Sequence, residues 1–513
     1  MLNSLEKSKH HLFIVAVLSL ISAILFLLSS TVKPYGFFID ELYFIACSKH
    51  LAWGYVDQPP LSIALLWLMQ FLFGSSIFVI RILPALSIAA TVFITGLIAR
   101  RLGGGLASIL LSGLGVMIMP VFLIFGSFYS MNSFEPLIWT TIVFFVLKMI
   151  QENRPQYWLH IGTLMGLGLE MKHTMVLYGA GLLIGFIFTD KRKLLFSRWI
   201  LLGGLACFLI ILPNLIWQIL HHFPSLELYR NSFGSKNISK TYLQVLIEQI
   251  VFANPFSFPL WITGLIYLAF PGGKRYRLFL FAFIFLMLLM LAGHSSRPDR
   301  ISSIYTFFMA SGAVAIEQHL QSFWRRLTLA SLAILMGLGG IILAPVFCPL
   351  LPPAILKHHI SRLGLKFDIE EGKKGEPIPQ WLADRIGWED LAVQVSQVYH
   401  SLPEDEQRNA VIISSNYGEA GALEYYAPGL GLPNVYSTHN SYHSWGPPSD
   451  TVHVYIGVFI DVETVRQKFE RVDEISVFHC ADCTRPQRNI PIYILRGPKF
   501  SMEKEWVNFK FYH

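Results

Sequence analysis

The stretch Leu12–Val32, LFIVAVLSLISAILFLLSSTV, decides the class of this protein. It holds about 20 mostly apolar residues, and a helix of that length, rising about 1.5 Å per residue, crosses a hydrocarbon core about 30 Å thick. A signal peptide is the alternative, but the stretch has no small-residue cleavage site and further apolar runs follow it. We therefore predict an uncleaved first membrane span.

The composition of the whole chain points the same way. The 513 residues are 53% hydrophobic and only 14% charged, whereas ordinary soluble domains carry about 25% charged residues. The fold class that we predict is a polytopic α-helical membrane protein. Its transmembrane helices, about 11 in number, are expected at residues 12–32, 78–98, 105–125, 134–150, 157–169, 174–189, 199–220, 251–270, 278–293, 302–317 and 327–348.

The net charge of +7 reflects membrane orientation rather than nucleic-acid binding. The basic residues cluster at short connections, and taking alternate connections as cytoplasmic puts all of these clusters on one side. We predict a cytoplasmic N-terminus, a C-terminal region outside the cytoplasm and no nucleic-acid partner. The clusters are Lys7/Lys9, Arg100–Arg101, Lys148–Arg154, Lys191–Lys193 with Arg198, Lys274–Arg277 and Arg325–Arg326.

Two regions outside the spans have a character of their own. The connection Pro34–Ile77 is long, aromatic-rich and moderately apolar, so we expect helices within 34–77 that lie along the membrane interface. After residue 350 the composition becomes that of a globular protein, which divides the chain into a membrane domain, 1–350, and a small extracytoplasmic α/β domain, 351–513. In the latter we predict strands at 410–415 and 452–458 and helices at 388–399 and 462–469.

Cys480 and Cys483 form the sequence HCADC near the C-terminus. A zinc knuckle would need a second pair of ligands, which the sequence lacks. Outside the cytoplasm the same two cysteines could instead form a local disulfide.

The segment Tyr35–Leu61, YGFFIDELYFIACSKHLAWGYVDQPPL, follows the first span and carries three carboxylates, Asp40, Glu41 and Asp57. Acidic residues beside a membrane are costly unless they face water or a polar cavity, so this segment is the first candidate for a functional site. The sequence has no phosphate-binding GxxxxGK[ST] loop and no HExxH or GxSxG motif. An ATP-driven pump and a common hydrolase are therefore disfavoured.

Other polar residues are expected at the same outer level. Carboxylates that face cations across a cavity suit a reaction in which a nucleophile is deprotonated and an anionic group is held. A transporter would use similar residues, so the pattern alone does not decide between them. These residues are Asn132 and Glu135 at the start of the fourth span, Lys172 and His173 at a break after the fifth, and Arg297 and Arg300 before the tenth.

Four segments together carry a family resemblance: DELYF…GYVDQPPL, SMNSFEPLIW, LEMKHT and YGEAGALEYY…HNSYHSWGPP. They resemble the bacterial dolichyl-phosphate-mannose–protein mannosyltransferase-like family, a branch of the C-type membrane glycosyltransferases that includes lipid A aminoarabinose transferase. The resemblance implies that fold, a site on the outer face of the bacterial inner membrane and a polyprenyl-phosphate-linked sugar donor. The implied acceptor is an envelope lipid, glycan or protein.

The resemblance also implies roles for individual residues. Asp40 would be the general base on the acceptor hydroxyl, with Glu41 as a second catalytic carboxylate and inversion at the anomeric centre. Arg297, Arg300 or Lys172 would receive the charge of the departing phosphate. Relatives often carry a tyrosine-rich run before the tenth span, and of that run only Tyr305 is clearly present in this sequence. Substrate contacts are expected from Asn132, Glu135, His173 and Tyr305. Asp57 would bind a sugar hydroxyl or a divalent cation; no other cofactor is implied.

Structural readings of the same residues stay open. Glu41 could be a structural partner, Asp57 could fix a turn before Gln-Pro-Pro, and Asn132 and Glu135 could cap the fourth span. At the level of the whole protein, the alternative function is a transporter or flippase of lipid-linked sugars, and a third is a catalytically silent scaffold for envelope assembly.

Overall fold

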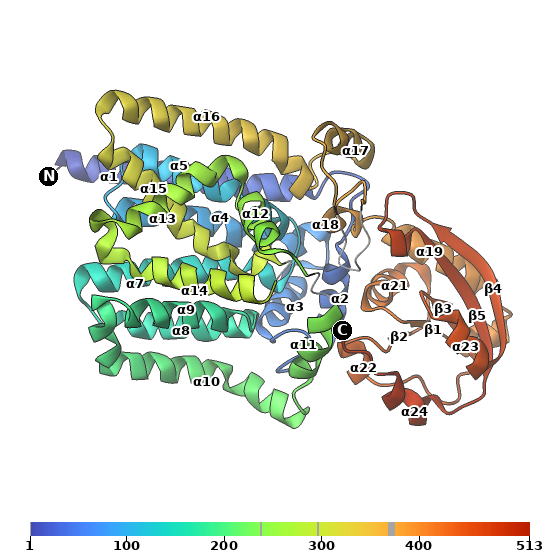
Figure 1. Cartoon of the computed structure of the whole chain (residues 1–513). Coiled ribbons are helices and arrows are strands. Elements are labelled where there is room, and N and C mark those ends of the chain that lie inside the picture. The colour runs from blue at the N-terminus through green and yellow to red at the C-terminus, as the bar shows by residue number, and fades with distance from the viewer. Residues whose placement is uncertain (1, 236–238, 295–296, 368–374) are drawn as a thin grey trace. The chain divides into compact units, whose positions relative to one another are not determined.

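The structure is a computed structural model that describes residues 2–235, 239–294, 297–367 and 375–513 (Figure 1). The chain forms two compact units, each assembled from three separate segments. Unit 1 comprises Met1–Thr31, Ile80–Trp217 and Asn237–Leu350, and unit 2 comprises Val32–Val79, Gln218–Lys236 and Leu351–His513. The predicted division at residues 350 and 351 stays a prediction.

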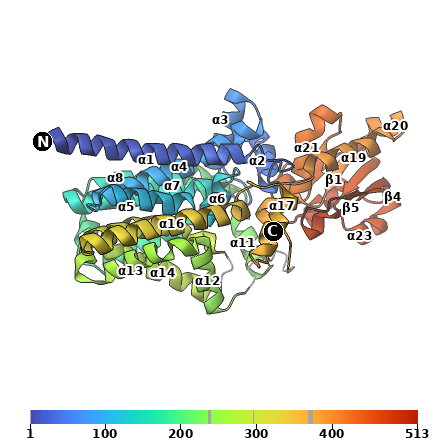
Figure 2. The same cartoon turned by 90° about the horizontal axis from the view of Figure 1, so that it is seen from above.

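Most of the long helices of unit 1 lie side by side along a common direction (Figures 1 and 2). Within it α5 packs against α1, α15 and α16, while α13 packs on α15, α14 on α9 and α7 on α8. The helices are α1 (Leu2–Ser29), α4 (Ile77–Arg101), α5 (Leu106–Met117), α6 (Pro120–Gly126), η1 (Met131–Ser133), α7 (Glu135–Glu152), α8 (Tyr157–Met171), α9 (Met175–Ile187), η2 (Asp190–Phe196), α10 (Arg198–Leu220), α12 (Tyr242–Phe252), η3 (Pro255–Ser257), α13 (Phe258–Ala269), η4 (Pro271–Tyr276), α14 (Leu278–Ala292), η5 (Pro298–Ile304), α15 (Tyr305–His319) and α16 (Ser322–Phe347).

Among the described residues, five helices are long and apolar enough to cross a membrane, and each of two bent pairs could form one more span. The five lie at His10–Ser29, Ile77–Arg101, Met131–Glu152, Arg198–Leu220 and Ser322–Phe347. By length and composition the chain is therefore a multi-pass membrane protein. Helices also occupy the other predicted ranges, but α8, α9, α14 and α15 have only 13 to 15 residues. The count of about 11 spans stays a prediction.

Two of the predicted spans are interrupted in the structure, and that each crosses the membrane stays a prediction. The range 105–125 is broken between α5 and α6, which meet at 65°, and 251–270 is broken between α12 and α13, which meet at 86°. Pro120 and Pro255 follow these breaks, and proline lacks the N–H that would continue a helix. The side-chain amide of Asn254 donates to the Ile118 carbonyl at 3.0 Å, so the two breaks contact each other. A backbone group freed at one break is satisfied by a side chain at the other.

The described basic clusters meet at one end of unit 1. Arg101 pairs with Glu152 at 3.1 Å, and Arg275 donates to the Ile150 carbonyl at 3.1 Å. The Gln318 amide donates to the Gly103 carbonyl at 3.1 Å, which joins the end of α15 to the same place. The side chains of Lys7 and Lys9 lie outside the described part of the chain. Because α7 has 18 residues, its first residue is about 27 Å from this basic end, roughly the thickness of a bilayer core.

Glycines allow α13 and α15 of unit 1 to pack closely. A Cβ atom on Gly264 of α13 would lie 2.2 Å from the Phe308 carbonyl oxygen, and one on Gly312 of α15 would lie 1.9 Å from that of Leu260. Only glycine fits at both positions. Membrane helices commonly use small residues in this way, because lipid provides no hydrophobic drive for their association.

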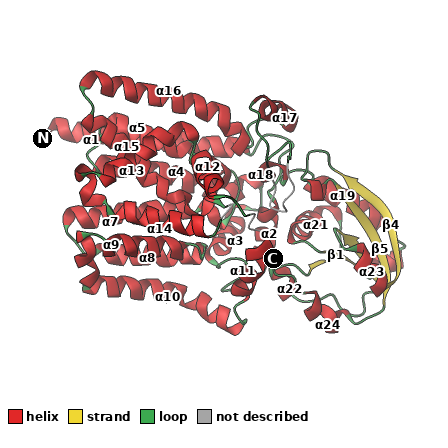
Figure 3. Cartoon of the chain, in the orientation of Figure 1, coloured by secondary structure: helices red, strands yellow, loops and turns green. Residues whose placement is uncertain are grey.

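Unit 2 combines helices with a five-stranded sheet (Figure 3). Its strands are β1 (Ala410–Ser414), β2 (Val435–Ser437), β3 (Val454–Val458), β4 (Phe469–His479) and β5 (Asn489–Pro498). Its helices are α2 (Ile39–Lys49), α3 (Leu61–Phe73), α11 (Pro224–Ser235), α17 (Pro353–Arg362), α18 (Gln380–Ala383), α19 (Trp388–His400), α20 (Glu404–Arg408), α21 (Tyr417–Leu430), α22 (Ser441–Ser444), α23 (Val462–Lys468), η6 (Arg485–Gln487), α24 (Met502–Glu505) and η7 (Trp506–Phe509).

The sheet has the order β2-β1-β3-β5-β4, with β1 parallel to β2 and β3, and β5 antiparallel to β3 and β4. Ile412 pairs with Ile456, and Ile456 with Ile494, so the middle strands place branched apolar residues in one row. One hydrophobic cluster of the unit includes Val411, Tyr455, Leu495 and Trp506. The two predicted strands are β1 and β3, whereas β2, β4 and β5 were not predicted. The connection between β4 and β5 contains a disulfide, Cys480–Cys483.

The segment after the first span forms two helices of unit 2, α2 and α3. Helix α2 packs against α21, and a Cβ atom on Gly421 would lie 3.0 Å from the Leu42 carbonyl oxygen. Helix α3 exposes large apolar side chains, with Phe71 72% and Phe73 63% exposed. Such a surface is expected of a helix at a membrane interface, and this location stays a prediction.

Candidate functional site

At the start of α2, the neighbouring acids Asp40 and Glu41 differ in burial and in hydrogen bonding. Glu41 is fully buried, and its carboxylate accepts a hydrogen bond from the Phe38 N–H at 2.7 Å. That bond satisfies one of the backbone donors that every helix leaves unpaired at its first turn. Asp40 is only half-buried. Successive residues of a helix point in different directions, so one acid can cap the helix while its neighbour faces outward.

Two tyrosines of unit 2 donate hydrogen bonds to the half-buried carboxylates of Asp40 and Asp57. The Tyr417 hydroxyl, from α21, donates to Asp40 Oδ1 at 3.0 Å, and the Tyr43 hydroxyl donates to Asp57 Oδ1 at 2.8 Å. The two rings lie 4.7 Å apart, centroid to centroid. We call these four residues the acid–tyrosine cluster. Burial and the neighbouring Asp57 carboxylate raise the pKa of Tyr43 well above its ordinary value, so Tyr43 stays a neutral hydrogen-bond donor.

The start of α22 and the loop before it support this cluster. The Ser441 N–H donates to the Tyr43 hydroxyl at 3.2 Å, and the Ser441 hydroxyl accepts from the Val56 N–H at the same distance. The His439 ring packs 4.7 Å from the Tyr417 ring. The segments DELYF, GYVDQPP, YGEAGALEYY and HNSYHSW, far apart in the sequence, therefore meet in one unit.

Gln58, next to Asp57, is fully buried. Within the described residues neither its side-chain oxygen nor its nitrogen has a hydrogen-bond partner. A buried amide of this kind costs free energy unless something pairs with it, so Gln58 joins the candidate residues of unit 2.

A second charged group lies in unit 1, around Lys172. Its ammonium lies 3.1 Å from Glu135 Oε2 and 4.0 Å from Asp299 Oδ2, and Arg297 Nε lies 3.1 Å from Asp299 Oδ1. Thr174 donates to the same oxygen of Glu135 at 3.3 Å. We call Glu135, Lys172, Arg297 and Asp299 the Lys172 cluster. Glu135 begins α7 and Lys172 follows the end of α8, which places the cluster at the end of unit 1 opposite the basic residues.

The cations around Asp299 outweigh its burial. Burial alone would raise the pKa of its carboxyl, but Arg297, Lys172 and Arg300 together lower this pKa to about 2. Asp299 is thus a carboxylate at neutral pH, and it balances part of the positive charge that was predicted to bind phosphate.

The remaining predicted residues occupy different surroundings in unit 1. The side-chain oxygen of Asn132, in η1, is buried and has no hydrogen-bond partner among the described residues. His173 hydrogen-bonds Asn214 of α10. Tyr305 is buried at the start of α15 and donates to the Gln249 side chain at 2.9 Å, so it contributes to the interior of the bundle.

The predicted site residues therefore form two groups. Asp40, Glu41 and Asp57 belong to unit 2, and the predicted residues from Asn132 to Tyr305 belong to unit 1. That the two groups of residues line one catalytic cavity stays a prediction. In the described residues no three His, Cys, Asp or Glu side chains are grouped to hold a metal ion, and the cation-binding role of Asp57 also stays a prediction.

Comparison with known proteins begins with a family model that covers Asp57, Asn132, Glu135, Lys172 and His173. Residues 57–217 match the dolichyl-phosphate-mannose-protein mannosyltransferase family. The family resemblance predicted from the sequence is confirmed over these residues. Asp40 and the arginines lie outside the matched range. No curated protein sequence matches the chain.

The chain also resembles solved structures of ArnT from Cupriavidus metallidurans. The structure with bound undecaprenyl phosphate superposes with a TM-score of 0.60 and 14% identity, covering 93% of this chain and 97% of that one. The apo structure gives a TM-score of 0.59 at the same identity and coverage. At this identity the likeness establishes the fold.

Sequence reasoning missed several residues of the two groups. Tyr43, Tyr417 and Ser441 lie inside the segments that carry the resemblance, but no sequence signal joins α2 to α21. Asp299 lies between Arg297 and Arg300 in the sequence. This short separation was the signal from which its pairing with an arginine could have been predicted.

Proposed function

We propose that this protein is a membrane glycosyltransferase. It moves a sugar from a polyprenyl-phosphate-linked donor to an envelope lipid, glycan or protein on the outer face of the bacterial inner membrane. The observation that carries the proposal is the fold, which this chain shares over 93% of its length with an ArnT structure that holds undecaprenyl phosphate. The match of residues 57–217 to the mannosyltransferase family supports the same reaction class.

The position of the Lys172 cluster supports a lipid-borne donor. It lies at the end of unit 1 opposite the basic residues, and basic residues mark the cytoplasmic side of membrane proteins. An outward-facing enzyme cannot use cytoplasmic nucleotide sugars and needs a donor carried by lipid. We assign Lys172, Arg297 and Arg300 to the donor phosphate, and Asn132, Glu135 and His173 to further substrate contacts. Lys172 and Arg297 already face carboxylates, so donor binding would exchange or share these partners.

Asp40 is the general base in this proposal. Its carboxylate takes the proton of the acceptor hydroxyl while the acceptor oxygen attacks the anomeric carbon. The bond from that carbon to the phosphate oxygen breaks on the opposite face, which inverts the centre and releases polyprenyl phosphate. The phosphate leaves as an anion that the cations stabilise, so no strong general acid is needed. The half-exposed position of Asp40 and its hydrogen bond from Tyr417 support this role.

The other two acids of the segment Tyr35–Leu61 receive different roles. Glu41 caps the first turn of α2, which supports a structural contribution to the placement of Asp40. Asp57, held by Tyr43, is half-buried and is assigned to a sugar hydroxyl or a divalent cation. Gln58, whose buried amide lacks a partner in the described residues, is assigned to the substrate as well.

Transfer of labelled sugar tests the proposal. Purified protein would be given polyprenyl-phosphate sugars and extracted envelope acceptors, and Asp40→Asn would be compared with Asp405→Asn, which changes an exposed carboxylate on α20. We expect Asp40→Asn to reduce kcat by at least about 100-fold and Asp405→Asn to leave it unchanged. Absence of transfer with every donor would overturn the glycosyltransferase, and full activity of Asp40→Asn would overturn the base.

One observation keeps a transporter or flippase of lipid-linked sugars as the second candidate. Transporters often place paired broken helices at mid-membrane, and the α5/α6 and α12/α13 breaks contact each other through Asn254. A proteoliposome assay separates the two functions. Movement of a lipid-linked sugar between leaflets without any transfer to an acceptor would favour the transporter.

A further inference from the structure

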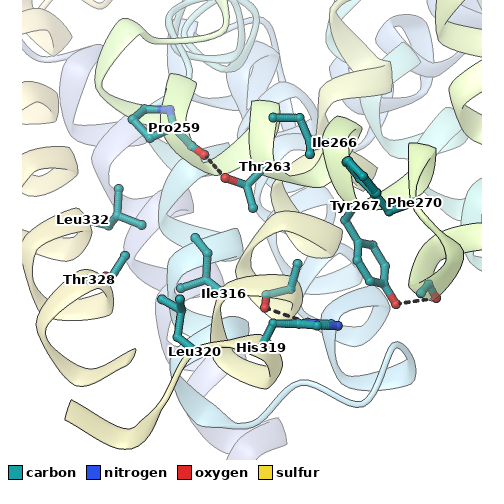
Figure 4. A pocket seen from close by; sticks show the side chains of 12 residues that line it. Pro259, Thr263, Ile266, Tyr267, Phe270, Ile316, His319, Leu320, Thr328 and Leu332 are labelled. Carbon is teal, nitrogen blue, oxygen red and sulfur yellow. Dashed lines mark hydrogen bonds between the residues drawn. The ribbon is translucent and has the colours of Figure 1, made fainter. Parts of the chain in front are cut away.

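A groove opens on the flank of unit 1, between α13, the end of α15 and the first half of α16 (Figure 4). It encloses about 600 Å³. That volume lies within the range of small-molecule sites, about 300–1,000 Å³. The groove is therefore large enough to hold part of a lipid molecule.

The groove is apolar along its length and polar at one end. Pro259, Thr263 and Ile266 line it from α13, and Phe270 lines it directly after that helix. From the first of these residues to the last, the helix rises about 16 Å. That length matches one leaflet, half of a hydrocarbon core about 30 Å thick. Leu332 of α16 closes the apolar part.

Hydrogen-bonding groups gather at the Phe270 end of the groove, where α13 and α15 finish. The Tyr267 hydroxyl donates to the Gly272 carbonyl at 2.9 Å, and one ring nitrogen of His319 lies 3.0 Å from the Ala315 carbonyl oxygen (Figure 4). The groove thus has the polarity of a phospholipid, with a headgroup end and a tail end.

Positive charge lies next to the polar end. Arg325 precedes Thr328, a lining residue of α16, by about one helical turn, and Arg326 is exposed beside it. Arg325 donates to the Glu317 carbonyl at 3.4 Å, which holds it near the end of α15. In the described part of the chain neither arginine forms an ion pair with a carboxylate. The nearby Glu317 carboxylate is engaged elsewhere, by the Gly105 N–H at 2.8 Å.

We propose that this groove binds one anionic phospholipid. One acyl chain lies along α13 from the polar end toward Pro259, and the phosphate lies beside Arg325 and Arg326, with Tyr267 and His319 at the headgroup. The lipid belongs to the leaflet that faces the basic end of unit 1, whereas the Lys172 cluster lies at the opposite end. The site is therefore separate from the proposed transferase site.

Lipid retention by the purified full-length protein tests this proposal. Native mass spectrometry would count bound phosphatidylglycerol and phosphatidylcholine with identical acyl chains. Thr328→Trp fills the groove, and Ile334→Trp is its control, because Ile334 is 63% exposed on α16 and does not line the groove. Arg325→Gln removes a headgroup charge, and Arg408→Gln removes an exposed charge on α20.

We expect one retained phosphatidylglycerol in the wild type, lost in Thr328→Trp and kept in Ile334→Trp. Arg325→Gln should weaken the preference for phosphatidylglycerol about fivefold, and Arg408→Gln should not change it. If Thr328→Trp does not fold, Ile266→Trp, at an exposed lining position, replaces it. Equal retention of both phospholipids, retention unchanged by the groove-filling variant, or displacement of the phospholipid by added polyprenyl phosphate would overturn the proposal.

Discussion

At the scale of single residues, the proposed chemistry depends on how two neighbouring acids are placed. Asp40 and Glu41 are adjacent in the sequence. The Glu41 carboxylate caps the start of α2 by accepting a hydrogen bond from the Phe38 N–H. The Asp40 carboxylate instead accepts a hydrogen bond from the Tyr417 hydroxyl. This hydrogen bond favours the ionised carboxylate, which is the form that a general base needs.

Replacing Tyr417 by phenylalanine should therefore change the pH dependence of transfer. We expect the acid limb of the kcat/KM profile to move to higher pH, because a hydrogen bond from the Tyr417 hydroxyl stabilises a charged acceptor. The sign follows from the loss of a donor that stabilises the ionised form. Tyr425→Phe, on the same helix, is the control, since its hydroxyl donates to the Ser75 carbonyl. A profile that stays in place would remove Tyr417 from the site.

The sequence could indicate Asp40 but not its partner. DELYF and the position after an apolar run single out the acid from local information alone. Tyr417 is 377 residues away, and its approach depends on the packing of α2 against α21. The same limit applies to Lys172: its charge is visible in the sequence, but its pairing with Glu135 requires α7 and α8 to lie together.

The buried pair of Lys172 and Glu135 gives a second prediction. Lys172→Met leaves the Glu135 carboxylate without its ammonium, and loss of one partner of a buried pair costs about 3–5 kcal/mol. We expect a clearly lower unfolding midpoint in detergent, partly restored by adding Glu135→Gln. Lys49→Met is the control, because the Lys49–Glu424 pair is more exposed and should contribute under about 1 kcal/mol. Equal effects of the two lysine changes would contradict this view.

At the scale of elements, helix identity was predictable and helix continuity was not. Apolar runs located helices at the predicted ranges, since hydrophobicity is local information. The breaks at Met119 and Asn254 depend on Pro120, Pro255 and a hydrogen bond between distant segments. Strand β4 was not predicted because it lies at the edge of the sheet and its burial pattern is irregular.

The contact between α2 and α21 gives a prediction at this scale. Gly421→Ala would place a Cβ atom within 3.0 Å of the Leu42 and Tyr43 backbone, which cannot retreat as a flexible side chain could. We expect destabilisation of about 1–3 kcal/mol and a displaced Asp40. Gly429→Ala on the same helix meets nothing within 4 Å and should be neutral or stabilising. Thermal unfolding and sugar transfer would be measured for both, and equal behaviour would contradict close packing at Gly421.

At the scale of the whole molecule, segments that are distant in sequence build each unit. Unit 2 takes α2 and α3 from the start of the chain and the sheet from its end. Local composition separated residues 1–350 from 351–513, but it could not show that the segment Tyr35–Leu61 packs on α21. The Cys480–Cys483 disulfide fits a location outside the cytoplasm, where such bonds persist.

The sidedness of the chain is the last prediction, and the choice of donor depends on it. Asp405, exposed in unit 2, and Arg154, at the basic end of unit 1, would each be changed to cysteine after the free cysteines Cys47, Cys207 and Cys348 are replaced. A membrane-impermeant maleimide should label position 405 in intact spheroplasts and position 154 only after permeabilisation, because basic connections stay in the cytoplasm. The reverse pattern would place the acid–tyrosine cluster in the cytoplasm. Nucleotide sugars would then be accessible to it, and a lipid-linked donor would no longer be required.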